Sequence, residues 1–294
     1  MAESALMTIE LTRRATLAGG LAGGLALLGW AATEPAGAAV APKVTYYPVT
    51  SSRVAVLVSG VTGSVRVQTL AGQVLGRGTA LSGAAIVSAT VPANTTTRLA
   101  VVTSTGIVQL SASTTTAALN ASLWRVANKR IALPSSFAPA LVTATGSFRL
   151  RRDCAAAYGY LRQAAARAGH PTGFTSAYRS YAGQLSLYNS YVRSLGPAGA
   201  DRQCARAGHS EHQLGLSIDL KGSVGTSALA QWISANAWRY GFIVRYPRTA
   251  TAVTGFEWEP WHVRYVGLPL AADFTRRKAA ALETYFGLPA APTY

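Results

Sequence analysis

Two short stretches of the chain contain most of the side chains that could bind a metal ion or transfer a proton. The first, Gly208 to Leu220, reads GHSEHQLGLSIDL, and the second, Glu257 to Gly267, reads EWEPWHVRYVG. Together they hold three of the 4 histidines and four of the 11 Asp and Glu residues of the 294-residue chain. Catalytic zinc takes three nitrogen or oxygen ligands and keeps one open position, so these stretches indicate a catalytic metal site.

The spacing within the two stretches favours one set of ligands. His212 lies in a predicted loop, and Asp219 and Ser217 share one face of the strand that follows it. His262 would come from a distant strand and complete a His/Asp/His set for zinc. On spacing alone, His209 could be the first histidine ligand of this set instead of His212.

A carboxylate close to the proposed ligands could act as the base. Glu259 lies three residues before His262, and on a straight strand the two side chains would face opposite ways. Pro260 has a fixed φ and no N–H, so a local bend could bring both to one cleft. A carboxylate beside a metal site can accept a proton from water and deliver it to a leaving amine. Glu257 competes with Glu259 for this role.

Of three other polar residues, two have two interpretations each. Arg179 lies among aromatic residues at the end of a predicted strand, which suits a substrate clamp, but a surface charge fits equally. Glu211 is either exposed to solvent or supports a neighbouring ligand. His170 precedes Pro171 in a turn and is expected to face solvent.

The elements that would position these residues follow from hydrophobic periodicity and from turn residues. Short strands and helices without regular βαβ alternation predict an α+β domain over residues 121–294, with a small antiparallel sheet and flanking helices. The predicted helices are 153–168, 182–194, 227–240 and 271–286. The predicted strands are 174–177, 216–220, 241–246 and 261–266, and 196–208 is a predicted loop.

The preceding part of the chain is different in composition. Residues 43–152 contain no Asp, Glu, His or Cys, so no typical metal site can form there. Alternating valines with Gly and Pro at turn spacing predict a small all-β sandwich or barrel of six or seven strands within 39–120. Its charged groups are all basic, which indicates either attachment to anionic cell-wall polymers or a structural spacer.

The first 38 residues resemble an export signal. Arg13 and Arg14 precede a glycine-rich uncharged run, and Ala36 to Ala38 offers a small-residue cleavage site. The paired arginines predict a twin-arginine signal and an exported, extracellular or wall-associated protein. An ordinary secretory signal and an uncleaved anchor are the alternatives. No later segment is apolar enough to span a membrane.

The net charge of +16 raises the possibility of a nucleic-acid partner. The basic residues are scattered single arginines without a Lys/Arg-rich run, however, so nucleic acid is not expected.

Two cysteines are present, and in an exported protein they are expected to pair. A Cys154–Cys204 disulfide would contribute roughly 4 kcal/mol through loop closure. The alternatives are two free thiols or a zinc ligand at Cys204.

Several motifs together resemble a known family. SEHQLGLSID, EPWHVRYVG, SAYRSYAGQLSLY, YGFIVRYP and VANKRIALPSSFAP are similar to segments of the LAS zinc metallopeptidases, the group that contains the VanY-type D-alanyl-D-alanine carboxypeptidases. The resemblance covers about residues 123–287 and leaves out the all-β part. It implies zinc ligands at His212, Asp219 and His262, and it implies that Glu259 is the catalytic base and acid. It thereby disfavours His209 as a ligand and Glu257 as the base.

The resemblance also implies the groups that bind the substrate. Arg179 would bind the scissile carbonyl or the terminal carboxylate and stabilise the oxyanion, and Gln184 and Ser210 would line the cleft. Two residues depart from the usual pattern, since Ser217 replaces an alanine and Ala177 replaces a glycine. Neither change removes a catalytic group.

Together with the predicted export signal, the resemblance implies an exported zinc-dependent peptidase that hydrolyses peptidoglycan stem peptides, with removal of the terminal D-Ala from D-Ala-D-Ala as the expected reaction. The alternatives are an L,D-carboxypeptidase or cross-bridge endopeptidase of the same wall, and a non-catalytic zinc-containing wall-binding module.

Overall fold

A computed structural model describes residues 41–294, so the predicted export signal at 1–38 lies outside the described residues. Within residues 41–294, no helix is both long and apolar enough to cross a bilayer.

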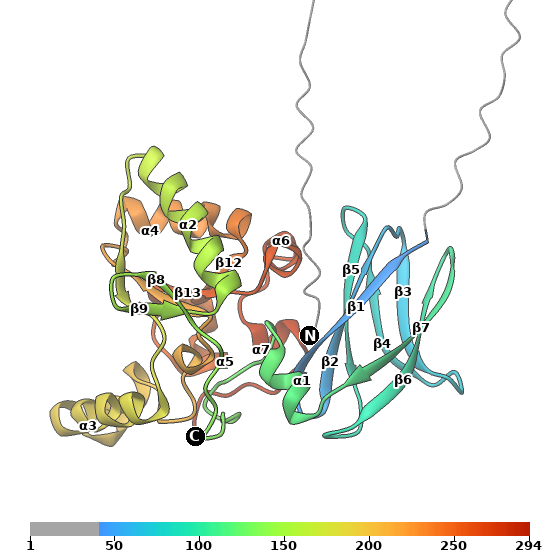
Figure 1. Ribbon diagram of the computed structural model, residues 1–294, viewed down its shortest axis with the longest axis horizontal. Helices are drawn as coiled ribbons and strands as arrows, with labels where there is room; N and C mark the ends of the chain where they lie inside the picture. The colour runs from blue at the N-terminus through green and yellow to red at the C-terminus, as the bar shows by residue number, and fades with distance from the viewer. Residues whose placement is uncertain (1–40) are drawn as a thin grey trace, which may run out of the picture. The chain divides into compact units, whose positions relative to one another are not determined.

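The first half of the described chain is a sandwich of two antiparallel sheets (Figure 1). One sheet has the order β1-β2-β5 and the other β4-β3-β6-β7. Valines that alternate along the strands form the core between the sheets, as the sequence predicts. The strands are β1 Lys43–Thr50, β2 Arg53–Ser59, β3 Ser64–Thr69, β4 Val74–Thr79, β5 Ala84–Thr90, β6 Thr96–Thr103 and β7 Gly106–Ser113.

Strand β2 is buried on both faces. Val54 and Val56 belong to the sandwich core, whereas Ala55 and Leu57 belong to a second apolar cluster that includes Trp124 and residues of the C-terminal helices. The three-stranded sheet is therefore covered on its outer side as well, and the described residues cluster as one compact unit. The proposed domain boundary near residue 120 stays a prediction.

A short helix and an extended segment connect the two halves. Helix α1 spans Thr116–Ala121, and Ser122 Oγ donates a 2.6 Å hydrogen bond to the carbonyl oxygen of Pro48. The indole N–H of Trp124 donates to the carbonyl oxygen of Val266 at 2.7 Å. The linking segment thereby ties the β-sandwich to the last sheet of the chain.

The second half has the predicted α+β architecture (Figure 1). Its central antiparallel sheet has the order β10-β11-β13-β12, with strands Phe174–Ser176, Ser217–Leu220, Glu259–Tyr265 and Phe242–Tyr246 respectively. A hairpin of β8 Val142–Thr145 and β9 Phe148–Leu150 precedes it. The helices are α2 Arg152–Arg167, α3 Tyr181–Gln203, α4 Ala228–Asn236, α5 Thr251–Thr254, α6 Leu268–Arg276 and α7 Leu282–Tyr285. Three 3₁₀ turns, η1 Glu211–Leu214, η2 Ala237–Tyr240 and η3 Arg248–Ala250, complete it.

Two predicted elements differ from the structure. The loop expected at 196–208 is largely helical, because α3 resumes after a kink at Gly196, whose φ of 69° a glycine tolerates. The single helix expected at 271–286 is two helices. The chain between α6 and α7 turns at Lys278, which has a φ of 52°.

The predicted Cys154–Cys204 disulfide is wrong, since both cysteines are free thiols. Cys154 lies on α2, fully buried in the apolar core of the second half. Cys204 caps the C-terminal end of α3, where its sulfur accepts a 3.3 Å hydrogen bond from Gln184 Nε2. Each thiol is therefore buried by its own set of neighbours.

Candidate active site

Two adjacent strands and one turn bring the predicted ligands together. Asp219 on β11 and His262 on β13 are direct partners in the antiparallel register. His212 lies on η1, which ends at Gly215 with a left-handed φ of 68°. A side chain at Gly215 would press on Leu141, so this tight turn into β11 depends on glycine.

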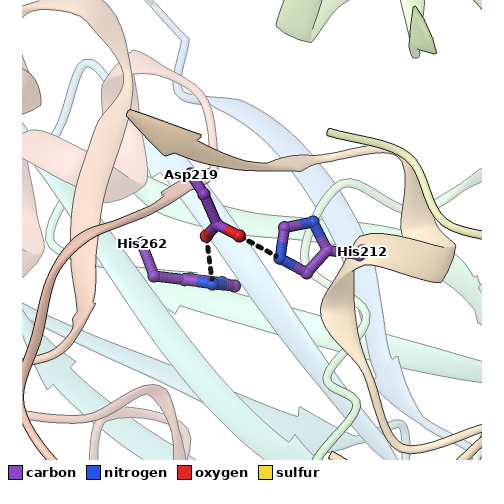
Figure 2. A group of neighbouring side chains, drawn as sticks. All are labelled: His212, Asp219 and His262. Atoms are coloured by element: carbon purple, nitrogen blue, oxygen red, sulfur yellow. Dashed lines mark ion pairs between the residues drawn. The ribbon is translucent and has the colours of Figure 1, made fainter. Parts of the chain in front are cut away.

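Asp219 lies between the two imidazoles, with one carboxylate oxygen toward each (Figure 2). Its Oδ2 is 3.2 Å from His212 Nε2, and its Oδ1 is 3.1 Å from His262 Nδ1. One nitrogen or oxygen from each of the three residues lies within 4.8 Å of the others. The structure thus places His212, Asp219 and His262 in one cluster, as the sequence analysis expects.

The surroundings fix which nitrogen of His212 faces the cluster. Its Nδ1 is 2.6 Å from the carbonyl oxygen of Ala177, which can only accept a hydrogen bond, so Nδ1 carries the proton. The lone pair of Nε2 then points at Asp219. Asp219 Oδ1 is also buried, and its 3.1 Å contact with His262 Nδ1 lacks hydrogen-bond geometry, so its lone pairs are free. Both atoms are in the state that a metal cation requires of its ligands.

The three side chains fit a zinc ion. Two imidazole nitrogens and a carboxylate oxygen are a usual catalytic zinc set, and ligands about 2 Å from a tetrahedral ion lie roughly 3.3 Å apart. The two imidazole nitrogens approach different oxygens of Asp219 at about this distance, and one ligand atom from each residue lies within 4.8 Å of the others.

The local field also favours a cation. Burial alone would lower the pKa of His262, but the carboxylates of Asp219, Glu211 and Glu259 raise it to about 9. Burial alone would raise the pKa of Asp219, but the two histidines hold that pKa well below its usual range. The position between them is therefore one where positive charge is stabilised.

Glu259 reaches the same cluster. Its Oε2 lies 3.7 Å from His262 Nδ1, although the two residues are three apart on one strand. The pairing of β12 with β13 is irregular between Val244 and Tyr246, and Tyr246 pairs with Glu259 itself. This irregularity lies where the sequence predicts a bend near Pro260. Burial, reinforced by Asp219, raises the pKa of Glu259 to about 7 against the opposing effect of His262.

Arg179 faces this group across one cavity. The cavity has a volume of about 140 Å³ and is lined by the three ligands together with Glu259, Arg179, Gln184 and Ser210. Arg179 Nη1 donates to Gln184 Oε1 at 2.8 Å, and its Nη2 donates to Ser176 Oγ at 2.5 Å. Gln184 Nε2 in turn donates to the carbonyl oxygen of Ala205 at 2.6 Å. The guanidinium is therefore held at the cavity wall by side chains that are themselves anchored.

Ser210 has a structural contact as well. Its Oγ accepts a 3.3 Å hydrogen bond from the backbone N–H of His212 and caps η1. It thus supports the turn that carries a ligand.

The competing residues lie elsewhere. His209 Nδ1 is 2.7 Å from the carbonyl oxygen of Asn128, its ring contacts Tyr294, and it does not line the cavity. Glu257 is exposed, with its carboxylate 3.9 Å from Arg202.

Sequence reasoning missed a buried ionic network behind the site. Glu211 Oε1 is 3.0 Å from Arg245 Nε and 2.8 Å from Arg264 Nη1, and Arg245 is 2.7 Å from Glu283. All four side chains are fully buried. The other oxygen of Glu211 is 3.9 Å from His262 Nε2, so the network reaches the back of a ligand. The arginines at 245 and 264, inside the largely buried strands β12 and β13, were the available signal.

Comparison with known proteins identifies the class. Residues 147–268 match the VanY family of D-alanyl-D-alanine carboxypeptidases. A D-alanyl-D-alanine carboxypeptidase of Enterococcus faecium is 43% identical over 113 residues, which are 37% of this chain and 34% of that enzyme. One of Enterococcus faecalis is 40% identical over 99 residues, 32% of this chain and 36% of that enzyme. YodJ of Bacillus subtilis, provisionally named a carboxypeptidase, is 34% identical over 178 residues, 54% of this chain and 65% of YodJ. The chain therefore spans less than two thirds of each of these curated relatives.

Solved structures agree in fold. One is the structure of the LD-carboxypeptidase LdcB, which was reported to reveal the basis of its peptidoglycan recognition. The match has a TM-score of 0.53 and 32% identity, and it covers 57% of this chain and 87% of LdcB. A mutant of the vancomycin resistance D,D-pentapeptidase VanY in complex with Zn(II) has a TM-score of 0.50 and 30% identity, covering 54% of this chain and 96% of that one. The chain belongs to the VanY-type carboxypeptidase family through its C-terminal half, which confirms the predicted family and fold class.

Proposed function

We propose that the protein is an exported, zinc-dependent peptidase that removes the terminal D-Ala from peptidoglycan stem peptides ending in D-Ala-D-Ala. The observation that carries this proposal is the convergence on one cavity of three metal-type ligands, a carboxylate and an arginine. The enterococcal relatives are named for this reaction, and the related VanYB structure was solved with D-alanine-D-alanine.

The residues divide the work by their chemistry. A zinc ion on His212, Asp219 and His262 would supply Lewis acidity toward a carbonyl oxygen and toward water. Arg179, with its donors held at the cavity wall, binds the terminal carboxylate of the peptide or the oxyanion that develops on its carbonyl.

Glu259 moves the proton. Its carboxylate accepts a proton from the water that adds to the scissile carbonyl carbon. It then returns a proton to the amine nitrogen as the C–N bond breaks, so that free D-Ala leaves. A pKa near 7 suits a group that must both accept and release a proton at neutral pH.

A second candidate is removal of D-Ala from the tetrapeptide by L,D-carboxypeptidase activity. It is supported by the similarity to LdcB, which is named as an LD-carboxypeptidase. A cross-bridge endopeptidase uses the same chemistry on a different bond. The non-catalytic alternative is disfavoured because Glu259 and Arg179 are both present at the cavity.

Export and association with the wall complete the proposal. The twin arginines and the small-residue site at Ala36 to Ala38 support export. The β-sandwich, which has basic residues and no acidic ones, would favour an anionic wall.

The test is a set of defined stem peptides. The purified protein is incubated with a pentapeptide ending in D-Ala-D-Ala, with the tetrapeptide ending in L-Lys-D-Ala, and with a cross-linked dimer. Products are identified by mass with and without a chelator. The proposal expects chelator-sensitive loss of one D-Ala from the pentapeptide at the highest rate. Faster cleavage of the tetrapeptide would show that L,D-carboxypeptidase activity, the second candidate, is the main one. If none of the three substrates is cleaved, the proposal that the protein is a peptidase is rejected.

A further inference from the structure

Two open cavities lie where the β-sandwich meets the C-terminal helices, one on either side of Arg53. The first, about 500 Å³, is lined by residues of β4, β5 and the segment around α7. The second, about 540 Å³, is lined by the β1–β2 turn, residues 125–134 and the segment after α7. Arg53 lines both, so the two cavities adjoin at this residue, and together they are here called the junction groove.

The junction groove is strongly basic. Arg77 and Arg277 join Arg53 in the first cavity, and Arg125 and Arg130 join it in the second. No Asp or Glu lines either cavity. Among residues 41–294, only Arg277 of these five has an ion pair, with Asp273 at 2.6 Å. Four guanidinium groups thus have no carboxylate partner. Of these, Arg125 is buried and its Nη1 donates to Asn120 Oδ1, so Arg53, Arg77 and Arg130 are the ones that can reach a ligand.

Two of these arginines also hold the groove in shape. Arg53 Nη2 donates to the carbonyl oxygen of Gly287 at 3.0 Å, and Arg277 Nη2 donates to the carbonyl oxygen of Thr79 at 2.8 Å. Each bond joins the β-sandwich to the C-terminal region. The basic surface is therefore fixed by the fold.

The positive surface continues onto the sandwich. Arg66 on β3 and Arg77 on β4 are direct cross-strand partners, and both are exposed. Like charges in directly opposed positions destabilise a sheet unless a counter-charge lies between them. An anion that lies along the first cavity and over this pair would relieve that repulsion.

We propose that the junction groove binds a polymer with phosphodiester groups in its backbone. Planar guanidinium forks match phosphate oxygens, and a row of arginines suits a chain of repeated phosphates better than a single small anion. Hydroxyl and amide groups of Ser88, Thr284 and Asn94 line the same walls and could bind neutral parts of the polymer.

A nucleic acid fits less well, because single strands bind by stacking bases on exposed aromatic rings. The aromatic residues of the groove are Tyr285, whose hydroxyl donates to Asp273, and Phe286, which is fully buried. The polymer proposal rests on the proposed wall-associated function for its setting, but the binding itself is independent of peptide hydrolysis.

The experiment measures binding of a fluorescent poly(glycerol phosphate) to the whole protein by polarisation. The test variant combines Arg77→Gln with Arg130→Gln, and the control combines Arg98→Gln with Arg162→Gln. All four arginines are exposed, and neither control residue lines the groove. Both variants lose two positive charges, and thermal unfolding checks that both are folded.

The test variant should bind roughly tenfold more weakly than wild type, as expected for lost charge-assisted contacts. The control should stay within about twofold, because remote exposed charges are screened by salt. Equal weakening of binding in both variants, or no binding by wild type, would contradict the proposal that the junction groove is the binding site. Two competition results would contradict the proposed ligand. They are competition by polyglutamate of equal charge as strong as that by unlabelled poly(glycerol phosphate), and stronger competition by oligo(dT). Cleavage of a soluble D-Ala-D-Ala peptide, measured in parallel, should be equal in all three proteins, so a failure of the peptidase is seen separately.

Discussion

Asp219 and His262 are register partners on neighbouring antiparallel strands, and the carboxylate of Asp219 lies 3.1 Å from Nδ1 of His262. Side chains at directly paired positions project from the same face of a sheet. Two of the three ligands are therefore positioned by backbone hydrogen bonding. Only His212 depends on a turn, and that turn is held by the glycine at 215 and by the cap at Ser210.

Removal of Asp219 should remove the metal. Asp219→Ala deletes the carboxylate that faces both imidazoles, so we expect the purified variant to contain less than about a tenth of the zinc of wild type. Metal content is measured by mass spectrometry after gel filtration. Glu257→Ala is the control, because that exposed carboxylate lies outside the cavity. Equal zinc in Asp219→Ala and wild type would refute this ligand set.

The buried network behind His262 should make stability depend on pH. Burial would raise the pKa of Glu211, but Arg245 and Arg264 hold it well below its ordinary value of 4.5. The folded state therefore binds this proton less readily than the unfolded state. The stabilisation is complete above pH 4.5 and is lost as the pH falls below that value. We expect Glu211→Gln to reduce the free energy of unfolding at pH 7 by about 3–5 kcal/mol, because it breaks a buried ion pair.

Urea unfolding of chelator-treated protein at several pH values measures both effects. Between about pH 6 and 3.5, the free energy of unfolding should fall less steeply in Glu211→Gln than in wild type. Glu257→Gln, whose ion pair is exposed, should change stability by less than about 1 kcal/mol and keep the wild-type slope. A Glu211→Gln slope equal to that of wild type would argue against the network.

Both thiols should be free and slow to react in the folded protein. Burial raises the pKa of Cys204 to about 11 and raises that of Cys154 further, so neither is a thiolate at pH 8. Alkylation by iodoacetamide should be slow in the native state and should reach two groups per chain in urea without a reductant. If the unfolded chain takes up no label until it is reduced, the disulfide exists after all.

Arg179 should act on the substrate and leave the metal in place. Arg179→Lys keeps the charge but loses the fork held by Gln184 and Ser176, so kcat/KM should fall by about 10²-fold with zinc content unchanged. Arg202→Lys, at an exposed position, is the matched control. An unchanged kcat/KM in Arg179→Lys would remove this residue from the substrate site.

The sequence predicted the local parts of the site well. His212 and Asp219 belong to one short turn and strand, and the bend near Pro260 explains how Glu259 and His262 face one cavity. Short-range spacing and proline geometry suffice for such features. The family resemblance separated His212 from His209, and the structure places them in different surroundings.

Features that depend on distant parts of the chain were not predictable. The partners of Arg245 come from positions 211 and 283, and nothing local indicates that pairing. Strand β2 is buried on both faces because the cluster around Trp124 covers its outer side, and the sequence of β2 alone does not indicate that contact. The disulfide was inferred from compartment and count, whereas burial in two separate environments keeps the thiols apart.

The central claim is that a zinc ion on the His/Asp/His set and the Glu259 carboxylate together hydrolyse a D-Ala-D-Ala peptide. The most direct measurement compares wild type with Glu259→Gln, in which an amide of the same shape cannot accept the proton. Zinc content and the release of D-Ala from a pentapeptide are measured on the same samples. We expect full zinc occupancy in both proteins and at least about 10²-fold slower release in the variant. Release at the wild-type rate from zinc-loaded Glu259→Gln would contradict the account.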